Sequence, residues 1–194
     1  MTVRPSKCIF GVDSVEFLGN QLQCGLGGLH EDNVAKIRDA PRPGTMKKIR
    51  SFMGLAGYYR DFISNFAGVV APLSGLTRNG QPIKVEWGDA QERAYQTGKA
   101  HLTSTPILHL PNPSKTYYLK TDASDSGIGA FLMHEHEGEL FAVCYASKKL
   151  SNAERNYSTI EKECLAIVWE SRDFIFTCKE CALYCRRITS LSST

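Results

Sequence analysis

The 194-residue sequence contains no long apolar run, and its first residues do not predict an export signal. A membrane-spanning helix needs about 18 or more mostly apolar residues in succession, and no stretch of this chain approaches that length. The first residues, Met-Thr-Val-Arg-Pro, contain no apolar core like that of a signal peptide. The seven cysteines are an odd number without the spacing of a disulfide framework. We therefore expect an intracellular protein with reduced thiols, neither exported nor anchored in a membrane.

The sequence also has little net charge, +3, which is too small to indicate a partner. Its distribution is uneven, because residues 1–80 contain ten Lys/Arg against six Asp/Glu, whereas residues 81–194 contain 13 against 14. Residues 42–60 contain no acid and five bases, which are Arg42, Lys47, Lys48, Arg50 and Arg60. This pattern predicts a local basic surface on a protein that is not basic as a whole.

The first part of the chain predicts short strands followed by helices. Residues 7–22 have the pattern of two strands around a Gly11–Ser14 turn, and the glycines at 25, 27 and 28 indicate a flexible loop. Helices are expected from His30 to the prolines at 41 and 43, over 46–63 after the N-cap Thr45, over 66–77 with an interruption at Pro72, and from an Asp89/Glu92 capping box to about His101.

After the prolines at 106, 111 and 113 the pattern changes to alternating strands. Residues 117–123, 127–135 and 139–147 predict three consecutive strands in an antiparallel meander. A helix over 158–172 follows, with a Ser158/Glu161 capping box and an expected apolar stripe of Ile160, Cys164, Ile167 and Val168.

Two further groups of residues have ordinary interpretations. Cys178, Cys181 and Cys185 resemble part of a zinc site, but a structural zinc ion needs four ligands and no histidine follows His136, so we interpret their spacing as coincidence. His134 and His136 alternate on one predicted strand among glutamates, which favours an exposed edge.

Several blocks of sequence, in order, resemble the Pol polyprotein of gypsy-type long-terminal-repeat retrotransposons. The blocks are KCIF with VEFLG at 15–19, the run 37–80, Trp87 with the segment 102–113, LKTDASDSGIGAFL at 119–132 and YASKKLSNAERNYSTIEKECLAIVWE at 145–170. The resemblance extends over about residues 5–172 and implies a mixed α/β (α+β) fold. It implies the C-terminal part of a reverse transcriptase (hairpin, thumb and connection) at 1–112, a partial ribonuclease-H-like domain at 113–172, and an unlike tail at 173–194.

The resemblance implies two activities, RNA-directed DNA synthesis and cleavage of RNA in RNA–DNA hybrids. DNA synthesis needs metal-binding carboxylates that the palm of such polymerases supplies, including an Asp-Asp pair, and this sequence contains no Asp-Asp pair. Polymerisation by this chain alone is therefore not expected. Lys47, Lys48 and Arg50 resemble the start of a thumb helix that lies along a nucleic-acid backbone, although a solvated helix face would show the same residues.

Cleavage of the RNA strand needs several carboxylates that hold two divalent ions. By resemblance, Asp122 and Glu163 are the first two of these acids, both catalytic and metal-binding, with Mg²⁺ as the implied ion. The alternative for Asp122 is a polar residue in a strand-end turn with Asp125. Glu161 competes with Glu163 but is already used by the capping box, and Glu170 is expected to be solvated.

The expected acids of the later part of the nuclease are missing, because only Asp173 and Glu180 follow Glu170. We therefore predict a fragment of an RNA-directed DNA polymerase and ribonuclease H with impaired activity. Its expected partners are an RNA–DNA hybrid or other nucleic acid and the remainder of a Pol polyprotein, in a cytoplasmic particle or the nucleus. The alternatives are a non-catalytic nucleic-acid-binding remnant and a decayed gene product without a stable fold.

Overall fold

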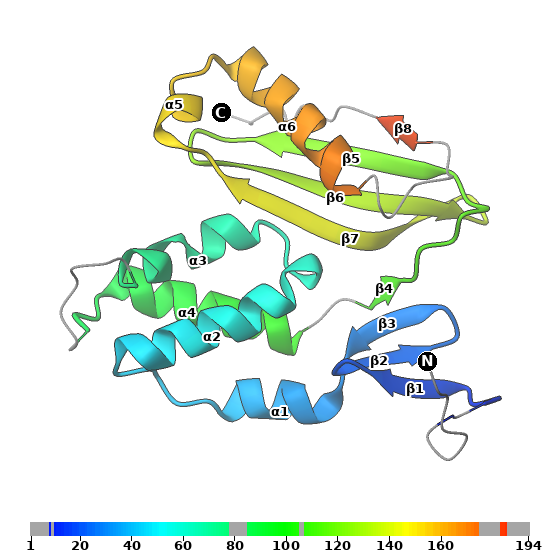
Figure 1. Cartoon of the computed structure of the whole chain (residues 1–194), viewed down its shortest axis with the longest axis horizontal. Helices are drawn as coiled ribbons and strands as arrows, with labels where there is room; N and C mark the ends of the chain where they lie inside the picture. The colour runs from blue at the N-terminus through cyan, green and yellow to red at the C-terminus, as the bar shows by residue number, and fades with distance from the viewer. Residues whose placement is uncertain (1–7, 9, 78–84, 105–106, 175–182, 186–194) are drawn as a thin grey trace, which may run out of the picture.

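A computed structural model describes residues 8, 10–77, 85–104, 107–174 and 183–185. The described elements form a mixed α/β fold with two four-stranded sheets and a group of helices (Figure 1). The fold class expected from the sequence is thereby confirmed. No helix among the described residues is both long enough and apolar enough to span a membrane.

The first sheet is antiparallel and small. Its strands are β1 (Ser14–Phe17), β2 (Asn20–Gln23), β3 (Leu26–Leu29) and β4 (Leu108–His109), in that order across the sheet. The first hairpin turns at Leu18–Gly19, and the predicted turn at Gly11–Ser14 is wrong. Leu18 and Gly19 both have positive φ, 51° and 77°, as a two-residue hairpin loop requires. Leucine seldom adopts this conformation, so the sequence does not signal the turn.

Strand β3 occupies the segment for which a flexible glycine loop was predicted. The turn lies earlier, at Cys24–Gly25, where φ is 48° and 80°. Gly27 pairs with Leu22 of β2 and with Leu108 of β4. The loop prediction is wrong because pairing on both sides stabilises these glycines as a strand.

The helical group follows the first hairpins. It consists of α1 (Glu31–Asp39), α2 (Met46–Tyr58), the short 3-10 helix η2 (Arg60–Phe62), α3 (Phe66–Gly75) and α4 (Asp89–Thr103). Two small cores hold it together: Ile37, Ala56, Tyr59, Ile63 and Leu102 in one, and Ile49, Phe52, Leu73, Ala94 and Tyr95 in the other. The predicted N-cap Thr45 is confirmed, because its hydroxyl accepts a hydrogen bond from the backbone N–H of Lys48.

Three helix predictions need correction. Helix α2 ends at Tyr58 because the chain tightens into η2, so the predicted helix to residue 63 is too long. Pro72 lies inside α3 without interrupting it, since Val70 and Leu73 are buried on either side and hold the helix in place. The N-cap of α4 is Gly88, whose N–H donates to Gln91, while Glu92 accepts from the Trp87 indole.

The second sheet has the order β7-β6-β5-β8. Strands β5 (Tyr117–Ala123), β6 (Gly127–His136) and β7 (Glu139–Lys149) are the predicted antiparallel meander, which is confirmed. Strand β8 (Leu183–Cys185) lies parallel to β5, in a tail for which the sequence predicted no element. The first strand of this sheet, β5, follows β4, which is the last strand of the first sheet along the chain. The division of the chain into domains at 112–113 stays a prediction.

Helix α6 (Thr159–Asp173) crosses one face of the second sheet, preceded by the short helix α5 (Asn152–Arg155) (Figure 1). The predicted Ser158/Glu161 capping box is confirmed by hydrogen bonds in both directions. The predicted apolar stripe is wrong, because Ile160 is 70% exposed and Cys164 and Val168 are also exposed. The buried face instead contains Lys162, Ala166 and Glu170, and Glu170 has no exposed surface, contrary to the prediction.

The helical group contacts the second sheet along strand β7. The backbone N–H of Ala67, at the start of α3, donates to the Ser147 hydroxyl over 2.9 Å. His134 of β6 is 4% exposed and its ring lies 5.3 Å from that of His109 in β4, so the prediction of an exposed histidine edge is wrong for His134. Cys178 and Cys181 lie outside the described residues.

Candidate functional site

Asp122 occupies the next-to-last position of β5, and its side chain is exposed. It lines a cavity of about 450 Å³ between the sheet and the segment before α3, together with Ser64, Asn65, Lys120, Ser124, Gly129 and Phe131. Burial alternates along β5, with Tyr117, Leu119 and Thr121 buried and Asp122 exposed, as expected of a strand covered on one face. The sequence thus folds Asp122 into a regular strand whose end is open to solvent.

The turn after β5 is held by its own polar groups. The backbone N–H of Ser124 donates to the Gly127 carbonyl over 2.8 Å, and the Ser124 hydroxyl donates to the same oxygen over 2.8 Å. In return, the N–H of Gly127 donates to the Ser124 hydroxyl over 3.1 Å. The carbonyl of Ser126 accepts from the N–H of Leu150, which ties the turn to the end of β7. Asp122 therefore leads directly into a well-supported turn.

Glu163 lies in the second turn of α6 and is half-buried. Ala166, one turn further on, packs with Ile128 and Leu150, and Leu165 and Trp169 contact the same cluster. On a helix of 3.6 residues per turn, Glu163 projects from the flank of α6 opposite Leu165. The start of the helix is fixed by the Ser158 cap, and the backbone hydrogen bond from Ser158 lowers the pKa of the Glu161 carboxyl, as does the Ser158 hydroxyl. Glu161 thus has the structural role predicted for it.

The structure places the two predicted acids on elements that pack against each other, since α6 contacts β5. Ala123 packs against the cluster that contains Ala166, so strand alternation directs Asp122 to the face of the sheet away from α6. Within the residues that the structure describes, no group of three or more His, Cys, Asp or Glu side chains could hold a metal ion. The use of Asp122 and Glu163 as one pair of ligands stays a prediction.

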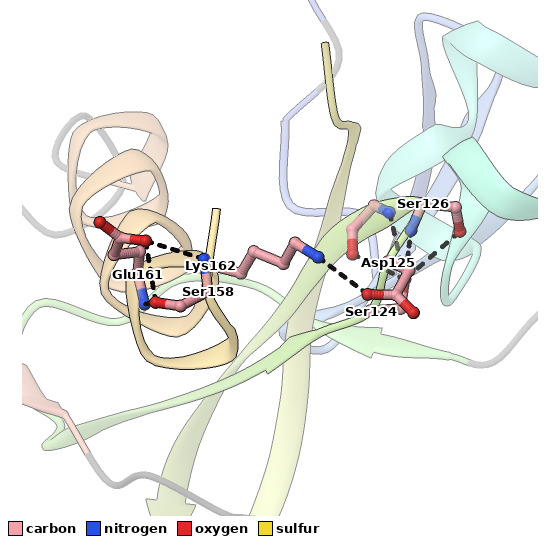
Figure 2. Close-up of polar contacts among 7 residues, drawn as sticks. Ser124, Asp125, Ser126, Ser158, Glu161 and Lys162 are labelled. Atoms are coloured by element: carbon pink, nitrogen blue, oxygen red, sulfur yellow. Dashed lines mark hydrogen bonds and ion pairs between the residues drawn. The ribbon is translucent and has the colours of Figure 1, made fainter. Parts of the chain in front are cut away.

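Sequence reasoning missed a charged contact beside these acids. Lys162 Nζ lies 2.8 Å from Asp125 Oδ1, and Figure 2 shows the lysine extending from α6 to the β5–β6 turn. The Lys162 side chain is 9% exposed, whereas that of Asp125 is fully exposed. The hydrogen bond from Lys162 lowers the pKa of the Asp125 carboxyl, and the lysine charge adds to this effect. The glutamates on both sides of Lys162 indicated a charged segment in the sequence. They did not identify the partner of Lys162, because Asp125 is 37 residues away along the chain.

The predicted nucleic-acid-binding residues lie together at the start of α2. Lys47, Lys48 and Arg50 are all exposed, and the first turn of the helix contains no acid. Arg50 donates to the Thr77 carbonyl over 3.0 Å, which holds this side chain near the end of α3. Basic residues oppose the dipole at a helix N-terminus, so helix stability does not account for them.

Comparisons with known proteins agree with this fold. Residues 87–180 match the family model described as an RNase H-like domain found in reverse transcriptase. The chain is 34% identical over 180 residues to the retrovirus-related Pol polyprotein from transposon opus and 35% identical over 197 aligned positions to that from transposon gypsy, both of Drosophila melanogaster. These alignments cover 87% and 95% of this chain but only 18% and 19% of the relatives.

Solved structures show the same fold at lower sequence identity. The foamy viral protease-reverse transcriptase in complex with double-stranded DNA superposes with a TM-score of 0.78 and 22% identity, over 92% of this chain and 31% of that chain. The same viral protein in complex with an RNA/DNA hybrid gives the same TM-score. The chain therefore belongs to the gypsy-type retrotransposon Pol polyproteins, corresponds to about a fifth of the relatives' length, and contains an RNase H-like domain of reverse transcriptases.

Proposed function

We propose that this chain holds nucleic acid as the thumb and connection part of a reverse transcriptase and contributes the first two acids of a ribonuclease H site. The observation that carries the proposal is the exposed start of α2, where Lys47, Lys48 and Arg50 lie together and the first turn contains no acid. The assignment of the two acids rests on the homology alone, because Asp122 lies on the face of β5 away from α6. The homology to Pol polyproteins supports an RNA–DNA hybrid as the substrate. The remainder of a Pol polyprotein would supply the polymerase carboxylates.

The described residues do not by themselves form a site for two divalent cations. A two-ion site needs carboxylates from several elements, and the described residues contain no group of three donors. Magnesium, however, keeps several waters and is often held by one or two carboxylates together with substrate phosphate. Because Asp122 faces away from the helix that carries Glu163, the two acids do not form one pair of ligands. Each would contribute a single carboxylate to an ion held mainly by substrate phosphate and other parts of a Pol polyprotein. The chain alone therefore does not complete the site, and we expect slow cleavage or none.

The basic start of α2 gives the chain its proposed affinity for nucleic acid. Lysine and arginine contacts to phosphate oxygens confer affinity without sequence preference. The exposure of Lys47, Lys48 and Arg50 leaves their charges available for this purpose. The second candidate function, a binding module without catalysis, is favoured by the missing third carboxylate and uses the same surface.

Binding is tested by titrating the full chain with an RNA–DNA hybrid at several salt concentrations. Neutralising Lys47, Lys48 and Arg50 to Gln should weaken binding for every sequence and reduce the magnitude of the salt slope by about one per lost phosphate contact. The matched control neutralises three exposed bases on other helices, Lys36, Arg38 and Arg93. Equal losses in both triple variants would show that α2 has no special role.

Cleavage is tested with a labelled hybrid and Mg²⁺. We expect slow release of RNA fragments by the full chain and loss of that release in Asp122→Asn and in Glu163→Gln. Cleavage that persists in both variants would refute the site. Binding without any cleavage would instead favour the non-catalytic module. A decayed, unfolded product would give neither binding nor a cooperative thermal transition.

A further inference from the structure

Strand β4 joins the two sheets through the ring of His109. The strand pairs with β3 of the first sheet and also contacts β7 of the second (Figure 1). The centroid of the His109 ring lies 4.4 Å from that of Phe141 and 5.3 Å from that of His134. His134 and Phe141 are themselves cross-strand partners in β6 and β7. One imidazole of the first sheet therefore packs on a pair of rings of the second sheet.

The surroundings of His134 suit only its neutral form. The side chain is 4% exposed, and its Nδ1 atom is buried without a hydrogen-bond partner among the described residues. The ring of Tyr117 lies 6.1 Å away, but its hydroxyl is used in hydrogen bonds with the backbone of Asn112. Protonation would give the imidazole a second N–H donor, and a buried donor or charge without an acceptor costs free energy.

The charged groups that act on this pair of histidines are basic. Lys115 and His136 lie near His134, and Lys115 Nζ is 2.8 Å from His136 Nδ1. The acid beside them, Glu137, is 4.0 Å from His136 and its side chain is 86% exposed. Burial lowers the pKa of both His109 and His134, and the neighbouring bases lower it further. A proton on either ring therefore has unfavourable neighbours.

We propose that His109 and His134 form an acid-sensitive joint, which holds β4 on the second sheet when both rings are neutral and releases it when they are protonated. Two unit charges about 5 Å apart change an equilibrium roughly 100-fold at the effective dielectric constant typical of proteins. A second contact along β7, from the N–H of Ala67 to the Ser147 hydroxyl, involves no titratable side chain. Acid should therefore open the joint at β4 and leave the Ala67 contact in place. The inference does not depend on the proposed function, since it concerns only the contact between the two sheets.

The test follows hydrogen exchange of two backbone amides of the full chain by nuclear magnetic resonance, as protection factors that correct for the intrinsic rate at each pH. The N–H of Leu110 donates to the Gly25 carbonyl over 2.8 Å, directly after the two-residue strand β4, and reports on the joint. The N–H of Ala67 reports on the contact that should persist. Opening should begin below about pH 6.5, the ordinary pKa of histidine, because the folded state favours the neutral rings. From about pH 7.5 to about pH 5.5, the protection of Leu110 should fall by at least about 10-fold and that of Ala67 should stay constant.

Two variants test the assignment to these histidines. Phenylalanine keeps an aromatic ring in place but cannot be protonated, so His109→Phe and His134→Phe should each remove most of the pH dependence at Leu110. The double variant should remove little more, because both changes abolish one shared repulsion. The matched control is His101→Phe, at a partly buried histidine near the end of α4, which should retain the full pH dependence. If His134→Phe fails to fold, His109→Phe decides the question, because the His109 ring is only half-buried.

Each outcome bears on the joint alone. Constant protection of Leu110 at the two pH values would overturn it, and so would a fall that persists in both phenylalanine variants. Equal losses of protection at Leu110 and Ala67 in acid would also overturn it, because the whole fold would then be opening. A fall at Leu110 that His109→Phe removes and His101→Phe does not would establish the joint, whatever the binding and cleavage assays give.

Discussion

Two glycines of strand β6 differ in the space around them, which gives a sharp test of the packing beside the site. Gly127 and Gly129 are two residues apart and both line the cavity next to Asp122. A Cβ at Gly127 would lie 2.9 Å from the Lys148 carbonyl oxygen, a backbone atom of β7. A Cβ at Gly129 would meet its nearest neighbour, the Ala146 carbonyl oxygen, at 3.8 Å, which is an ordinary contact.

The two alanine substitutions should therefore change stability in opposite directions. Alanine in place of a strand glycine gains about 0.5–1 kcal/mol from the reduced backbone freedom of the unfolded chain. At Gly129 this gain should remain, so Gly129→Ala should be neutral or slightly stabilising. At Gly127 the contact can be relieved only by moving β7 away from β6, and overpacking of this kind costs about 1–3 kcal/mol. Gly127→Ala should thus be less stable than Gly129→Ala by about 1–3 kcal/mol or somewhat more.

Unfolding in urea, followed by circular dichroism, measures this difference as a change in the free energy of unfolding. The two variants should have the same dependence on urea, because they expose the same surface on unfolding. Equal stability of the two variants would refute the reasoning, because it would mean that β6 and β7 separate there without cost.

Three further predictions concern stability. His134 is buried, and desolvation together with the nearby His109 lowers its pKa, so the unfolded chain binds a proton more readily than the folded chain. The free energy of unfolding should therefore be highest above about pH 6.5, the ordinary pKa of histidine, and should fall as the pH drops below that value. His134→Phe should flatten this pH dependence in urea titrations, and an unchanged slope would contradict the prediction. Ser158→Ala should cost about 1 kcal/mol in the same assay, because it removes the cap of α6, and no change would mean that Glu161 alone suffices. Leu132→Ala, at a position with no exposed surface, should cost about 2–5 kcal/mol in the thermal melt, whereas a loss below that range would indicate collapse of the cavity.

The strands around the site could be predicted from sequence because their signals are local. Alternation of apolar and polar residues located β5 and β6 within one residue of their observed ends. The Ser158 cap likewise located the start of α6. Asp122 and Glu163 were therefore assigned correctly to a strand and a helix, although nothing local specifies the distance between their carboxylates.

The buried face of α6 could not be predicted in this way. Ile160 and Val168 are apolar but exposed, while Lys162 and Glu170 are charged but buried. Hydropathy assigns these four residues to the wrong faces because it takes no account of partners far along the chain. The partner of Lys162 is Asp125, and only the tertiary fold brings the two together. The strand conformation of the glycines in β3 could not be predicted for the same reason, because it depends on pairing with β2 and β4.

Several polar contacts of the second sheet lie at the end that carries Asp122. The ion pairs of Lys162 and Lys148 lie there, and so do the caps of α5 and α6 and the hydrogen bond from Leu150 to the β5–β6 turn. The apolar cluster beneath α6 at this end is small, and its buried members are Ile128, Leu150 and Ala166. Apolar contacts are non-directional and tolerate sliding, whereas hydrogen bonds and ion pairs fix both distance and direction. Hydrogen bonds and ion pairs therefore contribute directly to positional accuracy at this end of the sheet, and their loss should shift the β5–β6 turn that follows Asp122 before it unfolds the domain.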